Sequence, residues 1–325
     1  MLAVDIEMNP VDGYAISSWD RGYGDFALTP DLSTLRRIPW LPGTALVLAD
    51  VRWPTGEPVV ESPRRILQDQ TARLAERGWQ AMLGNELEFL LFVDSYRVGR
   101  SQRYRRLQPA NQYNVDYSIL GQLPRRAADS ARSGWACATP ACAWNRRRVE
   151  CNPGQYEIAL KYDEAMRTCD NHVIYKNGAK RDRGSARICG DVHGQVRPAG
   201  GRAPATFTCL CVRRMASPSS LGERPYADSR RYSSISWLGS SRHSLNSRYS
   251  LRRASTRTSA ANPDPSHRPR SKWGIDNRTC AFRVVGHGPS LRVECRIPGA
   301  DVNPYLAAAA MSRRRSTRRG QPATS

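Results

Sequence analysis

The basic residues of this chain are concentrated in three segments without apolar periodicity, and this limits most strongly what the chain can fold into. Segments 121–148, 181–271 and 312–325 hold 28 basic residues against 6 acidic ones, and all 28 are arginine. They consist of scattered Arg, Ser, Pro, Gly and Ala, without the pattern that buries one face of a strand or helix. We therefore expect 181–271 not to be natively folded.

The remaining segments have the composition of ordinary globular sequence. Segments 1–120, 149–180 and 272–311 hold 22 basic and 23 acidic residues, including all four lysines of the chain. The formal net charge of +21 therefore arises in the Arg-rich segments alone. A charge of that size indicates nucleic acid or an anionic membrane as partner. A second interpretation is a GC-rich gene translated out of frame, because the abundant residue types have GC-rich codons.

Length and composition exclude several other classes of protein. A chain of 325 residues can form one large domain or two ordinary ones. Its longest apolar runs, such as Phe89–Val93, are too short to span a bilayer, and no signal-peptide pattern follows Met1. The nine cysteines form no C-x-x-C pair, which favours a reducing cytoplasm over a zinc ribbon or a disulfide scaffold.

Apolar patterns in the ordinary segments predict an α+β chain. Ser62 and Pro63 are typical of a helix start, and Gly78 is typical of its end. Two further helices are predicted over 163–176 and from Pro304 onward. The predicted strands are 44–51, 155–160, 281–285 and 291–297, with a strand pair at 80–83 and 86–92.

Five carboxylates lie on predicted strand faces. Glu86 and Glu88 are two residues apart, so both point to the same face of their strand. Glu150 and Glu157 flank a turn that enters a strand, and Glu294 shares a face with neighbouring arginines. Carboxylates with arginine nearby suit hard divalent cations and phosphate. For Glu-x-Glu alone, an exposed charged strand face is the more common interpretation.

Other nucleotide and metal motifs are missing. The sequence has no G-x-x-x-x-G-K-[ST] loop, and its short Gly-x-Gly pairs are not dinucleotide fingerprints. His172 lies within a predicted helix without a partner at ligand spacing, so we predict a structural role for it.

Several short blocks, taken together and in order, resemble the glutamine synthetase family. They are Asn85–Phe89, Glu150–Glu157, Tyr175–Lys180, Asp276–Arg283, Arg292–Gly299 and Asn303–Leu306. Gly24–Asp31 is similar to the end of that family's β-grasp domain, so the chain would start inside it, truncated at its first strands. The resemblance implies a partial β-grasp over 1–61 and a catalytic domain with a curved antiparallel sheet over 62–311. The segments 121–148 and 181–271 would interrupt this domain as aberrant sequence, and 312–325 would be an aberrant basic tail.

The resemblance also implies a reaction and its site. Family members use ATP to phosphorylate the γ-carboxylate of glutamate, and ammonia or a small amine then replaces the phosphate. Two Mg²⁺ or Mn²⁺ ions hold the phosphates. The implied ligands are Glu88, Glu150 and Glu157 for one ion, and Glu86 and Glu294 for the other. Arg278 and Arg283 match family arginines that bind the ATP phosphates, and Arg296 matches one that binds the carboxylate of glutamate.

The chain also departs from the family pattern. A His-x-His metal motif and a Tyr-Lys-Arg stretch belong between Lys180 and Lys272, and neither is present. The family's catalytic Asp from a neighbouring subunit is unassigned, although Asp12 lies near the right place. The family forms homo-oligomeric rings with active sites between subunits, and we do not expect a ring for this chain.

Back-translation tests the frameshift interpretation. Read one base earlier, Ala205–Val212 allows Cys-His-Ile-His, and Ser255–Ala260 allows Ile-Asn-Ser-Tyr-Lys-Arg. Ser312–Arg318 in that frame allows a continuation of the helix that starts at Pro304. No shifted motif was found for 121–148. The coding DNA is therefore predicted to hold small insertions or deletions near codons 181, 200, 271 and 311.

These observations lead to one main hypothesis and two alternatives. The main hypothesis is a glutamate–ammonia or glutamate–amine ligase by descent, cytoplasmic and inactive as translated. The first alternative is a basic nucleic-acid-binding protein with Arg-rich disordered segments. The second is an intact ligase for an amine other than ammonia, once the frame is restored. Neither ligase hypothesis requires a membrane or a specific nucleic acid.

Overall fold

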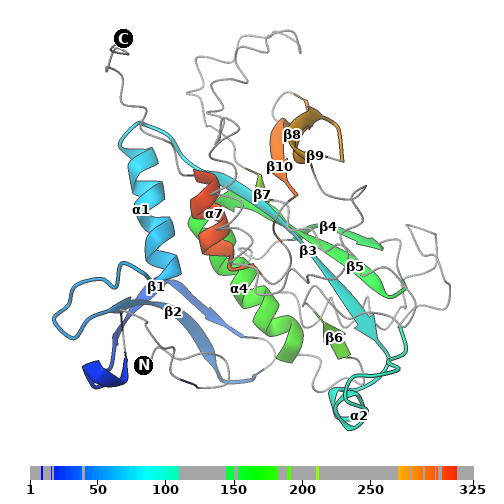
Figure 1. Ribbon diagram of the computed structural model, residues 1–325, viewed down its shortest axis with the longest axis horizontal. Coiled ribbons are helices and arrows are strands. Elements are labelled where there is room, and N and C mark those ends of the chain that lie inside the picture. The colour runs from blue at the N-terminus through cyan, green and yellow to red at the C-terminus, as the bar shows by residue number, and fades with distance from the viewer. Residues whose placement is uncertain are drawn as a thin grey trace, which may run out of the picture.

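The described part of the chain is an α+β structure (Figure 1). The computed structural model describes residues 18–38, 41–109, 144–149, 153–181, 189–191, 210–211, 270–278, 280–287, 290–296 and 302–312, and the single residues 9, 16 and 298. Within these residues the strands form three sheets, almost wholly antiparallel, beside a group of packed helices. The predicted α+β class is therefore confirmed.

A two-stranded antiparallel sheet forms the N-terminal part. Strand β1 (Ala27–Arg37) pairs with β2 (Ala45–Arg52), after a single 3-10 turn, η1 (Trp19–Arg21). The strand predicted at 44–51 is confirmed. Only the first part of strand β1 had been indicated, through the similarity of Gly24–Asp31 to the family's β-grasp domain. The rest was not predicted, because Pro30 and Ser33 interrupt the alternation of apolar residues.

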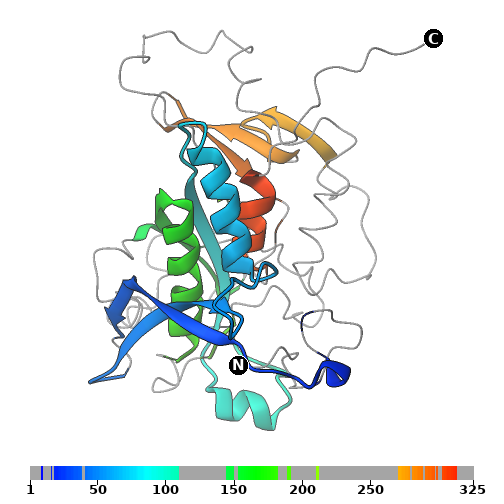
Figure 2. The same cartoon turned by 90° about the vertical axis from the view of Figure 1, so that its left-hand side faces the viewer.

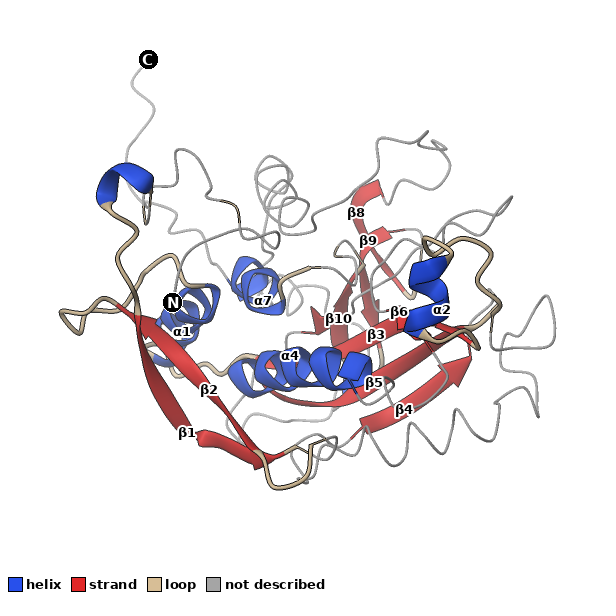
Figure 3. Ribbon diagram, turned by 90° about the horizontal axis from the view of Figure 1, so that it is seen from below, coloured by secondary structure: helices blue, strands red, loops and turns tan. Residues whose placement is uncertain are grey.

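Three helices lie between this small sheet and the main sheet (Figures 2 and 3). They are α1 (Pro63–Ala75), α4 (Ala165–Arg181) and α7 (Pro304–Ser312). All three were predicted, and α1 begins at Pro63 as expected. Gly78 has a φ of 68°, a left-handed conformation that turns the chain away after α1.

Small side chains on α7 let the helices approach one another closely. Ala307 and Ala308 are fully buried and pack in one cluster with Leu67 of α1 and Cys169 of α4. Leu83 joins the same cluster from the main sheet. Each leucine fully buried in this way contributes about 1.5–3 kcal/mol to stability. The helices and the main sheet therefore share one apolar core.

The main sheet has the strand order β4, β5, β3, β6. Its strands are β4 (Trp144–Val149), β5 (Gln155–Glu164), β3 (Met82–Phe92) and β6 (Cys189–Asp191). The strand pair predicted over 80–92 is wrong, because β3 is one strand with a single irregularity between Leu83 and Asn85. Gly84 lies between the two predicted strands, and a Cβ there would lie 3.5 Å from the Cβ of Tyr162, so this glycine lies close to β5 within the sheet.

A second sheet adjoins the first. Strand order is β7 (Leu210–Cys211), β10 (Arg292–Cys295), β9 (Cys280–Val285) and β8 (Arg270–Ile275), and only β8 and β9 run parallel. The strands predicted at 281–285 and 291–297 are confirmed, although the second ends at Cys295. Strand β7 pairs with β10 and also contacts β3. Among the described residues, the strands of the expected catalytic sheet thus form two adjoining sheets.

Parts of the Arg-rich segments contribute short strands. Strand β4 lies mostly in segment 121–148, while β6, β7 and the start of β8 fall in segment 181–271. Apart from Arg181 at the end of α4, the rest of these two segments lies outside the described residues, as does 313–325. Helix α2 (Tyr96–Ser101) follows β3. Across the described ranges, none of the helices combines the length and the apolar character that a bilayer crossing requires.

Candidate functional site

Strands β3 and β5 bring three of the predicted carboxylates together. Glu88 lies directly opposite Glu157 in the antiparallel register, and Glu86 lies opposite Ala159. Because opposite residues and residues two apart share a face, Glu86, Glu88 and Glu157 all lie on one face of the sheet. Leu87, on the other face, is fully buried in the core, as predicted.

The burial of this group fits a divalent cation. Glu88 is 6% exposed and Glu157 is 8% exposed, so two like charges face each other out of solvent. Such a pair is unfavourable unless a cation or hydrogen-bond donors offset its charge. Oxygen ligands of this kind are those that Mg²⁺ and Mn²⁺ prefer. The carboxylate oxygens are therefore of the type that the ion implied by the family resemblance binds.

Gln155 is a site residue that the sequence did not indicate. Its amide donates a hydrogen bond to Glu88, and its side chain is buried at the start of β5. It precedes Glu157 by two residues, so both lie on the face that carries Glu88. The Gln-x-Glu spacing on a strand was the available signal, and it predicts a shared face but not this hydrogen bond.

A second charged cluster lies on β9 and β10. Glu294 is opposite Arg283 in the antiparallel register, and its Oε2 lies 2.9 Å from Nη1 of Arg283. Its other oxygen, Oε1, accepts a hydrogen bond from Nη1 of Arg296. Glu294 is 6% exposed. The structure thus brings together three of the predicted residues, and both oxygens of the carboxylate already have arginine partners.

Asp276, the second residue missed by the sequence reasoning, holds the other side of Arg283. Nε of Arg283 donates to its Oδ1 at 3.0 Å, and Nη2 donates to the same oxygen. Burial opposes the charge of Arg283, but the hydrogen bonds to Asp276 and Glu294 outweigh it and raise the pKa of the guanidinium. The hydrogen bond from Arg283 lowers the pKa of Asp276 in turn. Arg283 therefore stays charged and is held from two sides.

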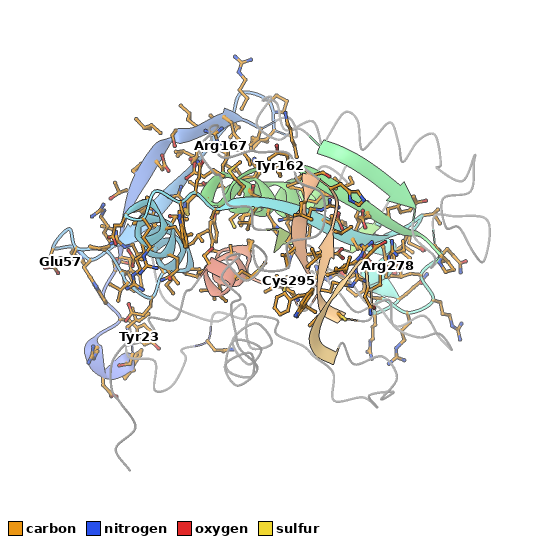
Figure 4. All side chains as sticks on the ribbon, turned by 90° about the horizontal axis from the view of Figure 1, so that it is seen from above. Tyr23, Glu57, Tyr162, Arg167, Arg278 and Cys295 are labelled. Carbon is orange, nitrogen blue, oxygen red and sulfur yellow. The ribbon has the colours of Figure 1, made fainter. Side chains whose placement is uncertain are left out.

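Two of the predicted residues remain, Arg278 and Glu150. Arg278 is exposed in the turn between β8 and β9, and Figure 4 shows it on the side of Cys295 that faces away from α7. Glu150 lies outside the described residues. In the described part of the chain, no group of three or more His, Cys, Asp and Glu side chains is arranged to hold a metal ion. The predicted ligand set is thus present only in part.

His172 lies behind the carboxylate face, in α4. It is fully buried, which confirms the predicted structural role, and its Nδ1 hydrogen-bonds with the side-chain amide of Asn85 on β3. Asn85 precedes Glu86, and the two side chains point to opposite faces of β3. Nε2 of His172 and Oδ1 of Asn85 have no partner among the described residues. Burial, and to a lesser extent Lys176, lowers the pKa of His172 to about 3.

We expect His172 to make the protein less stable in acid. Its pKa of about 3 in the folded chain lies below the ordinary value of 6.5, so the unfolded chain takes up a proton that the folded chain does not. Stability is then lost as the pH falls from 6.5 toward 3, by about 1.4 kcal/mol per pH unit. Urea unfolding at pH 7 and pH 5 should show a fall of about 2 kcal/mol from this group. His172→Gln should remove that part of the fall, and an unchanged pH slope in this variant would contradict the assignment.

Comparison with known protein families gives one match to a large part of the chain. The family model for the glutamine synthetase catalytic domain matches residues 60–182 and 266–313. The match leaves out 183–265 and 314–325, which are most of two Arg-rich segments, but it continues without a break through 121–148.

Individual relatives agree with this match. A γ-glutamylethanolamide synthetase of Streptomyces coelicolor is 44% identical over 324 residues, covering 96% of this chain and 66% of that protein. A glutamate–isopropylamine ligase of a Pseudomonas species is 31% identical over 325 residues, covering 94% of this chain and 67% of that protein. The chain therefore spans about two thirds of the length of these curated relatives.

Solved structures show the same fold. A structure described as a GmaS/ADP complex has a TM-score of 0.70 at 20% identity, covering 89% of this chain and 66% of that one. A glutamine synthase homologue has a TM-score of 0.66 at 18% identity, covering 89% of this chain and 67% of the other. At this level of identity the likeness supports the fold alone.

Proposed function

The chain belongs to the glutamine synthetase family, and from this premise we propose that it descends from an ATP-dependent ligase that joins ammonia or a small amine to glutamate. The observation that carries the proposal is the register of β3 and β5, which sets Glu88 opposite Glu157 as two buried carboxylates. Two buried like charges at this position are suited to a divalent cation. The reaction acts on phosphate and carboxylate groups, which need such a cation and arginines.

Each predicted residue has a role in this proposal. Glu88 and Glu157, with Glu150, would hold one cation, and Glu86 and Glu294 would hold a second. When bound, these cations supply positive charge to the oxygens of the transferring phosphoryl group. Arg278 and Arg283 would bind the ATP phosphates, since a guanidinium offers two parallel donors to phosphate oxygens. Arg296 would bind and orient the glutamate carboxylate.

The proposed reaction has two steps. An oxygen of the glutamate γ-carboxylate attacks the γ-phosphorus of ATP, the bond to the bridging oxygen breaks, and ADP leaves. The amine nitrogen then attacks the carbon of the acyl phosphate, phosphate leaves, and the nitrogen loses a proton. In the first step Arg283 would stabilise the negative charge that spreads over the phosphoryl oxygens.

The acceptor is proposed to be a small primary amine. Two relatives that are more than 30% identical are named for ethanolamine and isopropylamine as acceptors. Residues that would line the acceptor pocket are expected mainly between Lys180 and Lys272, where the family pattern is interrupted. A panel of ammonia, ethanolamine and isopropylamine is therefore the appropriate set of substrates.

We further propose that the chain as printed does not complete the reaction. It lacks the family's metal-binding histidine and its Tyr-Lys-Arg stretch, so one cation site and one substrate contact are incomplete. A cation held by fewer ligands is bound more weakly, and an unclamped substrate is poorly oriented for attack.

Trapping the acyl phosphate with hydroxylamine tests both proposals. With ATP, glutamate and Mg²⁺, the printed chain should form γ-glutamyl hydroxamate only at background level. A chain whose segments 181–271 and 312–325 are translated in the family's frame should exceed it by at least about 100-fold. The coloured ferric complex of the hydroxamate measures the product.

Two variants of the frame-restored chain serve as controls. Glu88→Gln should reduce hydroxamate formation by at least about 100-fold, because it removes a cation ligand. Glu57→Gln should leave it unchanged, because Glu57 is exposed in the turn between β2 and α1 (Figure 4). A frame-restored chain that is folded but forms no hydroxamate would contradict the ligase proposal. A printed chain that forms it efficiently would contradict the proposed inactivity.

A further inference from the structure

A strongly basic loop follows the end of β3 and includes α2. Residues 94–108 hold five arginines and a single acidic residue, Asp94. All five arginines are exposed, and they are Arg97, Arg100, Arg103, Arg105 and Arg106. We call residues 94–108 the basic loop. Figures 1 and 2 show α2 at one extremity of the molecule, beyond the end of β3, so these charges lie apart from the three packed helices.

The basic loop is closed at its base and packed from within. The N–H of Gln108 donates to Oδ2 of Asp94 at 2.7 Å, which joins the two ends of the loop. Tyr96 and Leu107 pack against a small apolar cluster at the end of β3. Compact surface loops of this kind hold their shape through their own side chains. A partner therefore meets charges that are already in place, which lowers the entropic cost of binding.

The positive charge of the basic loop is not compensated within the described part of the chain. None of its five arginines forms an ion pair or a side-chain hydrogen bond with another described residue. Arg64 and Arg283, by contrast, are paired with carboxylates. Because a guanidinium offers two parallel donors to phosphate oxygens, a phosphate-rich polyanion is the partner that this surface fits.

Tyr104 adds an aromatic surface among these charges. A Cβ on Gly99 would lie 3.2 Å from the ring of Tyr104, so the ring packs directly over the backbone of α2. The residue is nevertheless 50% exposed. A ring that is supported on one side and open on the other can stack on a nucleobase, while neighbouring arginines bind the phosphates of the same strand. Bases are open to such stacking in single strands.

Nucleic acid fits the basic loop better than an anionic membrane does. A surface segment that inserts among lipid headgroups carries exposed Trp, Phe or Leu on its apolar face. Leu107 is the one residue of these types in the loop, and it packs against the cluster at the end of β3 instead.

We propose that the basic loop binds single-stranded nucleic acid, with its arginines on the phosphates and Tyr104 stacked on a base. This binding has little dependence on base sequence, because every base has a face on which a ring can stack. The proposal goes beyond the ligase reaction and does not depend on it, since no residue of the loop has a role in that reaction.

Binding of a fluorescein-labelled oligothymidylate of about 20 nucleotides to the full chain, measured by anisotropy at several salt concentrations, tests the proposal. The double variant Arg100→Gln/Arg105→Gln removes two charges at positions without a left-handed φ. It should weaken binding at least about 5-fold near 0.1 M salt. It should also reduce the slope of log affinity against log salt by about 1.4, because each lost phosphate contact on a single strand contributes about 0.7.

The double variant Arg73→Gln/Arg77→Gln is the matched control. Both arginines are exposed at the end of α1, which lies away from α2 (Figure 1), and the charge removed is the same. This variant should change the affinity by no more than about 2-fold to 3-fold and leave the salt slope unchanged. It measures the effect of overall charge, including that of the Arg-rich segments. Equal effects of the two double variants would therefore overturn the proposal.

Substitutions of Tyr104 separate stacking from charge. Tyr104→Phe keeps the ring and should bind the strand as the unmodified chain does, whereas Tyr104→Leu should bind it at least about 5-fold more weakly. Binding of a duplex of the same length should not respond to Tyr104→Leu, because its bases are already stacked. Single-strand binding that is unchanged in Tyr104→Leu, or duplex binding that falls equally, would contradict the assignment to single strands.

A membrane arm completes the experiment. If Arg100→Gln/Arg105→Gln lost binding to phosphatidylserine vesicles but kept binding to the oligothymidylate, the loop would be a membrane surface and the proposal would be wrong. We expect the reverse, a loss for the strand that exceeds any loss for the vesicles. Circular dichroism of each variant verifies that it is folded, and Tyr104→Phe and the arginine variants keep the test decisive if Tyr104→Leu is not.

Discussion

Replacing Arg64 by alanine is expected to lower the free energy of unfolding by about 3–5 kcal/mol. Arg64, on α1, forms ion pairs with one carboxylate from each of three other elements. Its Nη1 lies 2.6 Å from Asp50 on β2, and its Nη2 lies 2.7 Å from Asp31 on β1 and 3.0 Å from Asp170 on α4. One guanidinium thus joins the small N-terminal sheet to two helices of the core.

Loss of Arg64 would leave a buried carboxylate without a cation to balance its charge. Asp170 has a side chain only 5% exposed, and its Oδ1 also accepts the hydroxyl of Tyr305 at 2.6 Å. Burial opposes the charge of Arg64, but its ion pairs outweigh it and raise the pKa of the guanidinium. The Ser33 hydroxyl, and then Arg64, lower the pKa of Asp31. Three carboxylates would remain close together with no cation between them, which accounts for the large expected loss.

The neighbouring residue provides the control. Arg65→Ala removes the same charge, but Arg65 makes an exposed pair with Asp69, in which both side chains are nearly 40% exposed. Pairs of this kind contribute about 0–1 kcal/mol. Urea unfolding at pH 7 should therefore separate the two variants by at least about 2 kcal/mol.

The pH dependence of the Arg64→Ala variant gives a second check. Without Arg64, Asp31 loses a guanidinium that lowers its pKa, so the folded variant takes up a proton there more readily than the folded unmodified chain does. The deficit relative to the unmodified chain should therefore shrink as the pH falls from 7 toward 4. Equal losses for the Arg64 and Arg65 variants, or a deficit that does not shrink in acid, would show that the ion network is not the cause.

Gly286→Ala is expected to cost about 3 kcal/mol or more. Gly286 follows β9 with a φ of 92°, and a Cβ there would lie 2.3 Å from the carbonyl oxygen of Ser290. That oxygen belongs to the backbone, so the clash can be relieved only by moving the connection between β9 and β10. Those strands carry Arg283 and Glu294, so the variant should also weaken the ion pair between these two residues.

Gly56 separates the clash from the backbone conformation. It has a φ of 95°, but a Cβ there would meet nothing within 4 Å. Gly56→Ala therefore measures the conformational penalty alone, about 1–2 kcal/mol. The thermal midpoint of Gly286→Ala should lie clearly below that of Gly56→Ala. Equal thermal midpoints would mean that the connection between β9 and β10 moves to accommodate the Cβ without a further loss of stability.

The shared face of Glu86 and Glu88 could be predicted from the sequence, because side chains two residues apart on a strand point to the same side whatever the strand packs against. The helix at Pro63 could be predicted for a similar reason, since its capping pattern and apolar spacing are local. The continuous strand β3 could not, because glycine is locally disfavoured inside a strand and Gly84 is found there through the close approach to Tyr162. Whether the strand continues through Gly84 depends on β5, a partner strand distant in the sequence.

The sequence by itself determined the family and the division of the chain into ordinary and Arg-rich segments. Ordered motifs and the clustering of arginine are both properties of residue order. It placed the described carboxylates on strand faces and indicated a structural role for His172. Only the tertiary structure decided which charges meet: Gln155 with Glu88, Asp276 with Arg283, and two arginines on the single carboxylate of Glu294. The reason is that strand register and burial, which decide both the partner and the strength of an ion pair, arise from packing between segments far apart in the chain.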